Sequence, residues 1–192
     1  MLYFDFSHLP VFLTERLQLR AIRSSDVDAL YALRSDPRVM RYVDRPLART
    51  REEVEDLVQR MLTGYTENTG ASWCITHADA DTLIGNIGIW RIDAANHRGE
   101  IGYILHPDLH NKGYMTEAMR PVLQYAFEDL GLHTIEANIN PLNIGSQRIL
   151  EKHGFILEAY FRDNCYFNDV FSDSAIYTKF NPAHPVYSPQ KL

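Results

Sequence analysis

A loop that contains a glycine and precedes a helix offers the clearest chemistry in this sequence. Residues 100–118 read as a short strand, a proline-containing loop, Gly113 and the start of an amphipathic helix. The first N–H groups of a helix lack intrahelical acceptors and carry the positive end of the helix dipole, so they can bind an anion such as pyrophosphate. A lone glycine here more often only makes a turn. Neither the three-glycine dinucleotide fingerprint nor a Gly-Lys-Ser/Thr phosphate loop is present, which disfavours the usual phosphate-loop families.

Hydrophobic periodicity predicts the elements that must position this loop. Residues 17–22 alternate between apolar and mostly polar side chains, as in a half-buried strand. Residues 25–28 resemble a helix N-cap with an acidic third position, and the helix is expected to run toward Pro37. Residues 50–53 form a capping box for a second amphipathic helix, which has ended by Gly70.

Strand-like patterns dominate the chain from Ser72 onward. Three short runs rich in branched and aromatic residues predict an antiparallel meander: Ser72 to His77, Leu83 to Trp90 and Glu100 to Leu105. Met115 to Leu130 carries the clearest helical stripe, closed by Gly131. The remaining expected elements are a strand from Thr134 to Ile139, a helix from Asn143 to His153, and strands from Phe155 to Arg162 and Ser174 to Phe180. This order predicts an α/β (α+β) fold with one mixed, mostly antiparallel sheet flanked by helices.

Composition limits the classes of protein that fit. A chain of 192 residues, 45% of them hydrophobic, suits one domain, expected over residues 1–180, with a proline-containing tail over 181–192. The net charge of -6 argues against nucleic acid as a direct partner and would suit a cationic acceptor. The two cysteines, Cys74 and Cys165, favour a reducing compartment. The sequence begins without a signal-like segment and has no apolar run of roughly 18 residues, so we expect a cytoplasmic protein without membrane contact, as a monomer or homodimer.

Six segments, taken in order and spacing, resemble the GCN5-related N-acetyltransferases (GNAT), in particular the branch that acetylates ribosomal-protein N-termini at serine or alanine. The segments are Leu13 to Arg20, Ile84 to Gly88, Ile101 to Tyr103, Lys112 to Ala118, Asn143 to Ser146 and Leu150 to Phe155. The resemblance implies a GNAT-like acyl-CoA N-acyltransferase fold. In that fold the fourth and fifth strands, here Glu100 to Leu105 and Thr134 to Ile139, splay apart to admit acetyl-CoA.

The resemblance also implies which residues bind acetyl-CoA, the expected cosubstrate. Backbone groups at the end of the fourth strand would pair with the pantetheine arm, and the side chain of Asn143 would hydrogen-bond it. The strand-end residues are Tyr103, Ile104 and Leu105, and the pyrophosphate loop comprises Asn111, Lys112, Gly113, Tyr114, Met115 and Thr116. His110 and Met115 depart from the family pattern, so we expect weakened contacts rather than lost binding, since backbone N–H groups do most of the phosphate work.

Two side chains are the predicted catalytic groups. Glu100 resembles the base of the ribosomal-protein branch, acting directly or through water; the alternative is an ordinary carboxylate at a strand edge. Ser146 matches a serine that supports the departing thiolate, because the tyrosine used by many relatives is Leu150 here; the alternative is helix-start hydrogen bonding. Backbone N–H groups at a bulged strand end near Ile104 and Leu105 are the expected oxyanion donors.

Other polar and aromatic residues carry weaker expectations. His106 and His110 flank Pro107 and have no third ligand nearby in sequence, so we expect no metal. Trp90 and Tyr114 are candidates for the acceptor groove, and burial in the core is the alternative for both. The final hairpin should border that groove through Arg162, Asp163, Asn168 and Asp169.

The sequence therefore predicts an N-acetyltransferase that moves an acetyl group from acetyl-CoA to a primary amine, with the N-terminal amine of a ribosomal or other protein as one acceptor. Two alternatives stay open. One is a small amine acceptor such as a polyamine, an aminoglycoside or an amino acid. The other is a non-catalytic CoA-binding sensor.

Overall fold

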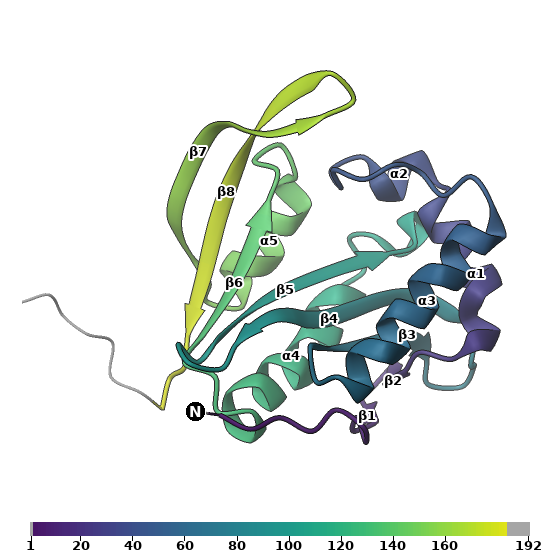
Figure 1. Cartoon of the computed structure of the whole chain (residues 1–192), viewed down its shortest axis with the longest axis horizontal. Coiled ribbons are helices and arrows are strands. Elements are labelled where there is room, and N and C mark those ends of the chain that lie inside the picture. The colour runs from purple at the N-terminus through teal and green to yellow at the C-terminus, as the bar shows by residue number, and fades with distance from the viewer. Residues whose placement is uncertain (1, 184–192) are drawn as a thin grey trace, which may run out of the picture.

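One eight-stranded sheet organises the computed structural model, which describes residues 2–183 (Figure 1). The strands are β1 (Phe12–Leu13), β2 (Leu17–Ala21), β3 (Gly70–His77), β4 (Leu83–Asp93), β5 (Arg98–Leu105), β6 (Thr134–Ile139), β7 (Ile156–Phe167) and β8 (Val170–Phe180). Their spatial order is β1-β2-β3-β4-β5-β6-β8-β7, and every neighbouring pair is antiparallel except β5 and β6. The predicted mixed, mostly antiparallel sheet is confirmed.

Helices cover both faces of this sheet. They are α1 (Val27–Arg34), α2 (Pro37–Met40), α3 (Arg51–Thr66), α4 (Tyr114–Gln124) and α5 (Ile144–Lys152), and α4 continues into a π-helical turn over Tyr125–Asp129. Helices α1 and α3 lie on one face and α4 on the other (Figure 1). The predicted stripes are the buried faces, for example Val54 and Val58 on α3 and Met119 and Val122 on α4. As expected from the capping box, the Thr50 side chain accepts a hydrogen bond from the Glu53 N–H.

The sheet opens between β5 and β6. These parallel strands pair only at their first residues, where Arg98, Gly99 and Glu100 face residues 134–136. Beyond Glu100 the two strands diverge, so the edge of β5 that faces β6 has no strand partner from Ile101 to Leu105. The predicted splay of the fourth and fifth strands, which are β5 and β6 here, is confirmed.

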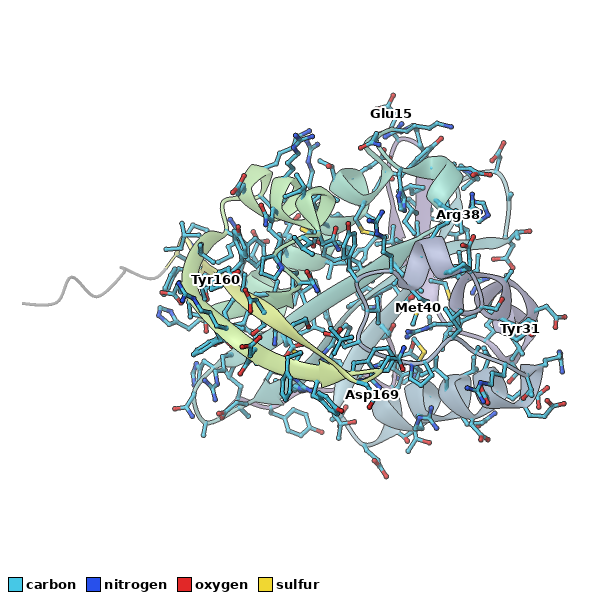
Figure 2. All side chains as sticks on the ribbon, turned by 90° about the horizontal axis from the view of Figure 1, so that it is seen from above. Glu15, Tyr31, Arg38, Met40, Tyr160 and Asp169 are labelled. Carbon is cyan, nitrogen blue, oxygen red and sulfur yellow. The ribbon has the colours of Figure 1, made fainter. Side chains whose placement is uncertain are left out.

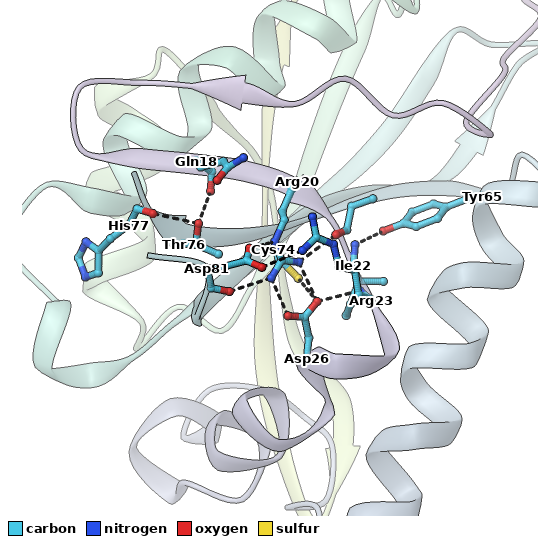
Figure 3. A network of polar contacts seen from close by, with 11 residues as sticks. Gln18, Arg20, Ile22, Arg23, Asp26, Tyr65, Cys74, Thr76, His77 and Asp81 are labelled. Atoms are coloured by element: carbon cyan, nitrogen blue, oxygen red, sulfur yellow. Dashed lines mark hydrogen bonds and ion pairs between the residues drawn. The ribbon is translucent and has the colours of Figure 1, made fainter. Parts of the chain in front are cut away.

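A buried ion pair fastens the first long strand to the first helix (Figure 3). The Arg20 guanidinium of β2 donates to both carboxylate oxygens of Asp26, at 2.8 and 2.7 Å, and both side chains are at most 5% exposed. Asp26 also accepts from the Arg23 N–H at 2.8 Å, and Arg20 reaches Asp81 in the turn between β3 and β4. The predicted N-cap at Ser25 is wrong, because Asp26 holds this helix start through its carboxylate and no side chain caps α1.

The C-terminal region differs from its prediction in two ways. Strands β7 and β8 are longer than expected and meet at the two-residue turn Asn168–Asp169, where both residues have positive φ. The pattern of β7 concealed this length, because most of its residues are exposed and none is buried. Asn181, the first residue of the predicted tail, is buried and donates to the carbonyls of Phe127 and Leu132. Residues 184–192 of that tail lie outside the described part of the chain.

Candidate active site

A cleft of about 1090 Å³ follows the opening between β5 and β6. It brings together five of the residues that the sequence singled out: Glu100, Tyr103, Ile104, Asn143 and Ser146. Its far end is bounded by the loop 42–49 after α2 and by the hairpin residues Cys165, Asp173 and Ser174. The cleft therefore connects the predicted catalytic groups with a broad outer region.

The start of α5 places two polar groups at the opening of the sheet. The Asn143 side chain caps the helix by accepting a hydrogen bond from the Ser146 N–H at 3.1 Å, which leaves the amide NH₂ of Asn143 unused by the cap. The Ser146 hydroxyl lies 2.7 Å from the Tyr103 hydroxyl on β5, and either atom can donate. The serine is 6% exposed, and the contact of its hydroxyl within the described residues is with Tyr103.

The side chain of Tyr103 is a site group that the sequence did not reveal, since only its backbone was expected to contribute. Burial raises the pKa of Tyr103 to about 12, although the hydrogen bond with Ser146 lowers it. The phenol is therefore protonated at neutral pH. A clue was present in the sequence, since the resemblance implies a tyrosine hydroxyl at position 150, where this chain has leucine. In the structure the Tyr103 hydroxyl of β5 lies beside Ser146.

Glu100 is the last residue of β5 that pairs with β6, and the sheet opens just beyond it. Its carboxylate accepts from the Trp90 indole N–H at 3.3 Å and pairs with the exposed Arg91 guanidinium at 2.9 Å. Trp90 reaches this position because residue 102 is glycine: a Cβ there would lie 2.2 Å from the indole ring. Trp90 lines the cleft, as expected for a groove residue.

The predicted strand bulge near Ile104 and Leu105 is wrong. The β4–β5 register is regular from Leu105 to Glu100, and the irregularity lies between Trp90 and Asp93 on β4. Arg91, inside that irregular stretch, has a positive φ of 49°. The bulge thus orients the side chains of Trp90 and Arg91 toward Glu100.

The loop before α4 has the geometry of an anion site. Asn111 and Gly113 both have positive φ, 60° and 81°, and Gly113 is the N-cap of the helix. The first helical hydrogen bond runs from the Glu117 N–H to the Gly113 carbonyl at 3.0 Å, so the N–H groups of residues 114–116 have no intrahelical acceptor. These groups can receive a pyrophosphate oxygen.

Arg16, just before β2, holds this loop. Its guanidinium donates to the Lys112 carbonyl at 3.0 Å, pairs with Glu117 at 2.7 Å and lies 4.3 Å from the centroid of the Tyr114 ring. Burial would raise the pKa of Glu117, but hydrogen bonds from Thr14 and Arg16 outweigh that effect and lower it. The carboxylate therefore stays charged and keeps the loop fixed against the sheet.

Several other expectations resolve differently. Tyr114 is absent from the described residues that line the cleft, and its ring packs on His77 and Arg16 instead. The hairpin borders the cleft through other residues than those expected, since Arg162, Asp163, Asn168 and Asp169 are not among its described lining residues.

Residues 2–183 contain no group of three or more His, Cys, Asp or Glu side chains that could hold a metal ion, and no helix among them could cross a membrane.

The free edge of β5 at Tyr103 and Ile104 and the Asn143 side chain line the cleft, whereas Leu105 and residues 111–116, which include the free N–H groups of the helix start, are not among its described lining residues. A family model described as an acetyltransferase (GNAT) domain matches residues 16–156. The chain belongs to the GNAT family. It is an acetyl-CoA-dependent N-acetyltransferase, so the alternative of a non-catalytic sensor is set aside.

Individual GNAT proteins support this assignment. The chain is 33% identical to the uncharacterized N-acetyltransferase YoaA of Bacillus subtilis, over 90% of this chain and 98% of that protein. Two solved structures share the fold. The ribosomal L7/L12 alpha-N-protein acetyltransferase RimL, in complex with coenzyme A, has a TM-score of 0.82 at 19% identity, covering 91% and 100% of the two chains. The spermidine N-acetyltransferase of Vibrio cholerae, in complex with CoA and spermine, has a TM-score of 0.78 at 21% identity, covering 88% and 97%.

Proposed function

We propose that this GNAT enzyme acetylates the N-terminal amine of a protein or peptide. The observation that carries the proposal is the charge of the cleft. Five arginines line it against four carboxylate residues, although the chain as a whole has a net charge of -6. A polyamine or an aminoglycoside carries several positive charges and would need a surplus of carboxylates. A peptide N-terminus presents one amine on an extended chain, which suits a broad cleft bounded by a loop and a hairpin.

The proposed chemistry assigns each step to a residue. Acetyl-CoA supplies the thioester whose carbonyl carbon the amine attacks. Glu100, directly or through a water, takes the proton from the incoming ammonium group. Ser146 donates a hydrogen bond to the departing thiolate, and Tyr103 keeps that serine oriented. Asn143 and the backbone of Tyr103, Ile104 and Leu105 hold the pantetheine arm, while residues 111–116 hold the pyrophosphate.

The likeness to RimL agrees with a protein N-terminus as the acceptor. The spermidine N-acetyltransferase has the same fold but acts on a different acceptor. Fold likeness at this level of identity does not choose between the two, so the local charge decides the proposal. The net charge of -6 would suit a cationic acceptor, but the charged side chains that line the cleft are five arginines and four carboxylates.

An acceptor panel tests the proposal. Thiol release from acetyl-CoA would be measured with tetrapeptides that begin with alanine, serine or methionine, with spermidine, and with an aminoglycoside. Each peptide has an Nα-acetylated copy as its control. We expect kcat/KM to be highest for a free peptide and to vanish for its blocked copy. A higher kcat/KM for spermidine or the aminoglycoside than for every peptide would reject a protein N-terminus as the acceptor.

A further inference from the structure

Arg34, the last residue of α1, lines the cleft without a charged partner. Its Nε is buried and has no hydrogen-bond partner, and its Nη1 donates only to the Met40 sulfur at 3.7 Å. Thioether sulfur is a weak acceptor. No carboxylate within residues 2–183 forms an ion pair with Arg34, so most of the capacity of this guanidinium for hydrogen bonding is unused.

This arrangement is energetically unfavourable for the isolated protein. Burial, and then the nearby charge of Arg45, lower the pKa of Arg34, yet an arginine remains charged at neutral pH. A partly desolvated charge that lacks a partner costs free energy. The same desolvation strengthens any hydrogen bond that the guanidinium makes to an incoming anion.

The other arginines of the cleft also favour an anionic ligand. Arg34, Arg45, Arg49, Arg60 and Arg91 are the arginines of the cleft, and among the described residues only Arg91 has an ion-pair partner, Glu100. Arg45 lies on the loop between α2 and α3. The tip of the β7–β8 hairpin at Asp169 points toward the α2 helix that carries Met40 (Figure 2). The four unpaired arginines therefore come from α1, α3 and the loop 42–49, and none of them comes from β5 or β6.

We infer that Arg34, assisted by Arg45, binds a carboxylate of the acceptor, so that the preferred substrate is a peptide N-terminus with an aspartate or glutamate among its first residues. The inference rests on the proposed function and narrows it. Arginine is suited to this task because its planar donors match the two oxygens of a carboxylate. Arg34 is thus a specificity-determining residue, separate from Glu100 and Ser146.

The competing explanation is structural. Arg34 occupies the last turn of α1, where a cation favours the helix C-terminus. In that case its replacement would lower stability and affect all acceptors equally. A ratio between two acceptors that differ only in charge separates the explanations.

The test uses tetrapeptides that begin with alanine and carry one glutamate at position two, three or four, each compared with the glutamine isostere. For the wild-type enzyme we expect kcat/KM to be at least about tenfold higher for glutamate at one of these positions, as a charge-assisted hydrogen bond provides. Arg34→Met should bring that ratio close to one while leaving turnover of the glutamine peptide within about threefold. Arg38→Met is the matched control, since Arg38 is exposed, pairs with Asp36 and lies outside the cleft.

Two outcomes would overturn the inference: a glutamate-to-glutamine ratio below about threefold at every position, or an unchanged ratio in Arg34→Met. The Arg45→Met variant carries the same test on an exposed residue if Arg34→Met melts without cooperativity. Failure of the proposed function can be distinguished from failure of this inference. If the proposed function is wrong, the enzyme would acetylate spermidine and would acetylate none of the peptides. In that event, calorimetry of the glutamate and glutamine peptides with the CoA-bound enzyme still measures whether the carboxylate is recognised, and equal affinities would overturn the inference.

Discussion

The hydroxyl oxygens of Tyr103 and Ser146 lie 2.7 Å apart and join strand β5 to helix α5 across the opening of the sheet. If the tyrosine donates to the serine, the serine proton is free to point at a sulfur leaving group in the cleft. The raised pKa of Tyr103 keeps the phenol protonated and able to donate. In the proposed mechanism the pair acts as one polar unit, in which the serine faces the thioester sulfur and the tyrosine orients the serine.

Replacing Ser146 by alanine should lower turnover more than cofactor binding. Charge develops on sulfur only as the thioester breaks, so a donor there acts mainly on the transition state. Loss of one such donor is expected to reduce kcat by about 10- to 1,000-fold. Calorimetry with CoA should give a dissociation constant within about threefold of wild type. Equal kcat in the two proteins would mean that Ser146 only supports the helix start.

Adding Tyr103→Phe to Ser146→Ala separates the effect of the serine on catalysis from its effect on the stability of the fold. Ser146→Ala leaves the partly buried phenol of Tyr103 without its partner, which costs at most about 1–3 kcal/mol of stability. The double variant removes both hydroxyl groups and should recover part of the melting temperature of Ser146→Ala. Its kcat should stay as low as that of Ser146→Ala. Recovery of activity together with stability would show that the loss came from misfolding.

Glu100→Gln should lower turnover strongly near pH 7 and less at high pH. A primary amine is mostly protonated at neutral pH and cannot attack until a base removes a proton. At higher pH free amine forms in solution, so the variant should recover in part. Glu136→Gln is the control, because Glu136 faces Glu100 in the β5–β6 register and lies outside the cleft. Parallel pH profiles that differ by less than about threefold between wild type and Glu100→Gln would assign the proton transfer to another group.

Gly113→Val should raise the dissociation constant of CoA. A branched side chain disfavours the φ of +81° at this position and would also crowd the Arg16 guanidinium that holds the loop. The N–H groups of residues 114–116 would then lose their alignment toward a phosphate. Gly131→Val is a matched control, since Gly131 has a similar φ of +66° at the other end of the helical segment. Calorimetry that gives the same increase for both variants would reject the loop as the pyrophosphate site.

Asp26→Asn should destabilise the fold by roughly 3–5 kcal/mol, because it leaves the buried Arg20 without its main carboxylate. Burial would raise the pKa of Asp26, but hydrogen bonds from Arg20 and Arg23 lower it below its ordinary value of 3.8. A lowered folded-state pKa means that this stabilisation is complete above pH 3.8 and is lost as the pH falls through the lower folded value. Urea titrations between pH 7 and pH 2.5 should show a smaller loss of stability on acidification in the variant. An identical pH dependence would show that other carboxylates control acid unfolding.

The sequence predicted those parts of the fold that local periodicity specifies. The stripes of α3 and α4 and the central strands of the meander follow from residues that are buried on one side. Strand β1 has two residues, too few for any periodicity. The length of β7 was hidden by its exposure, although the adjacent Asn168 and Asp169 were a signal for a two-residue hairpin turn.

The sequence predicted the part of the candidate site that a local backbone motif specifies, but not the contacts between side chains that are distant in sequence. The loop around Gly113 could be predicted because a glycine precedes a helix. The contact between Tyr103 and Ser146 spans 43 residues, and the unpaired state of Arg34 depends on the whole cleft. Neither has a local pattern, because each arises from the packing of one element against another.

The short pairing between β5 and β6 makes the molecule two half-sheets joined at a seam. One half, β1 to β5, carries Glu100 and Tyr103, and the other, from β6 to β8 with α5 packed alongside, carries Ser146. Acetyl-CoA lying in the seam would take the place of the missing strand. Its pantetheine arm would bond to the backbone of β5 in one half and to the Asn143 side chain in the other. The Tyr103–Ser146 contact already spans this seam, so the two halves hold these groups at a fixed spacing before any carrier binds.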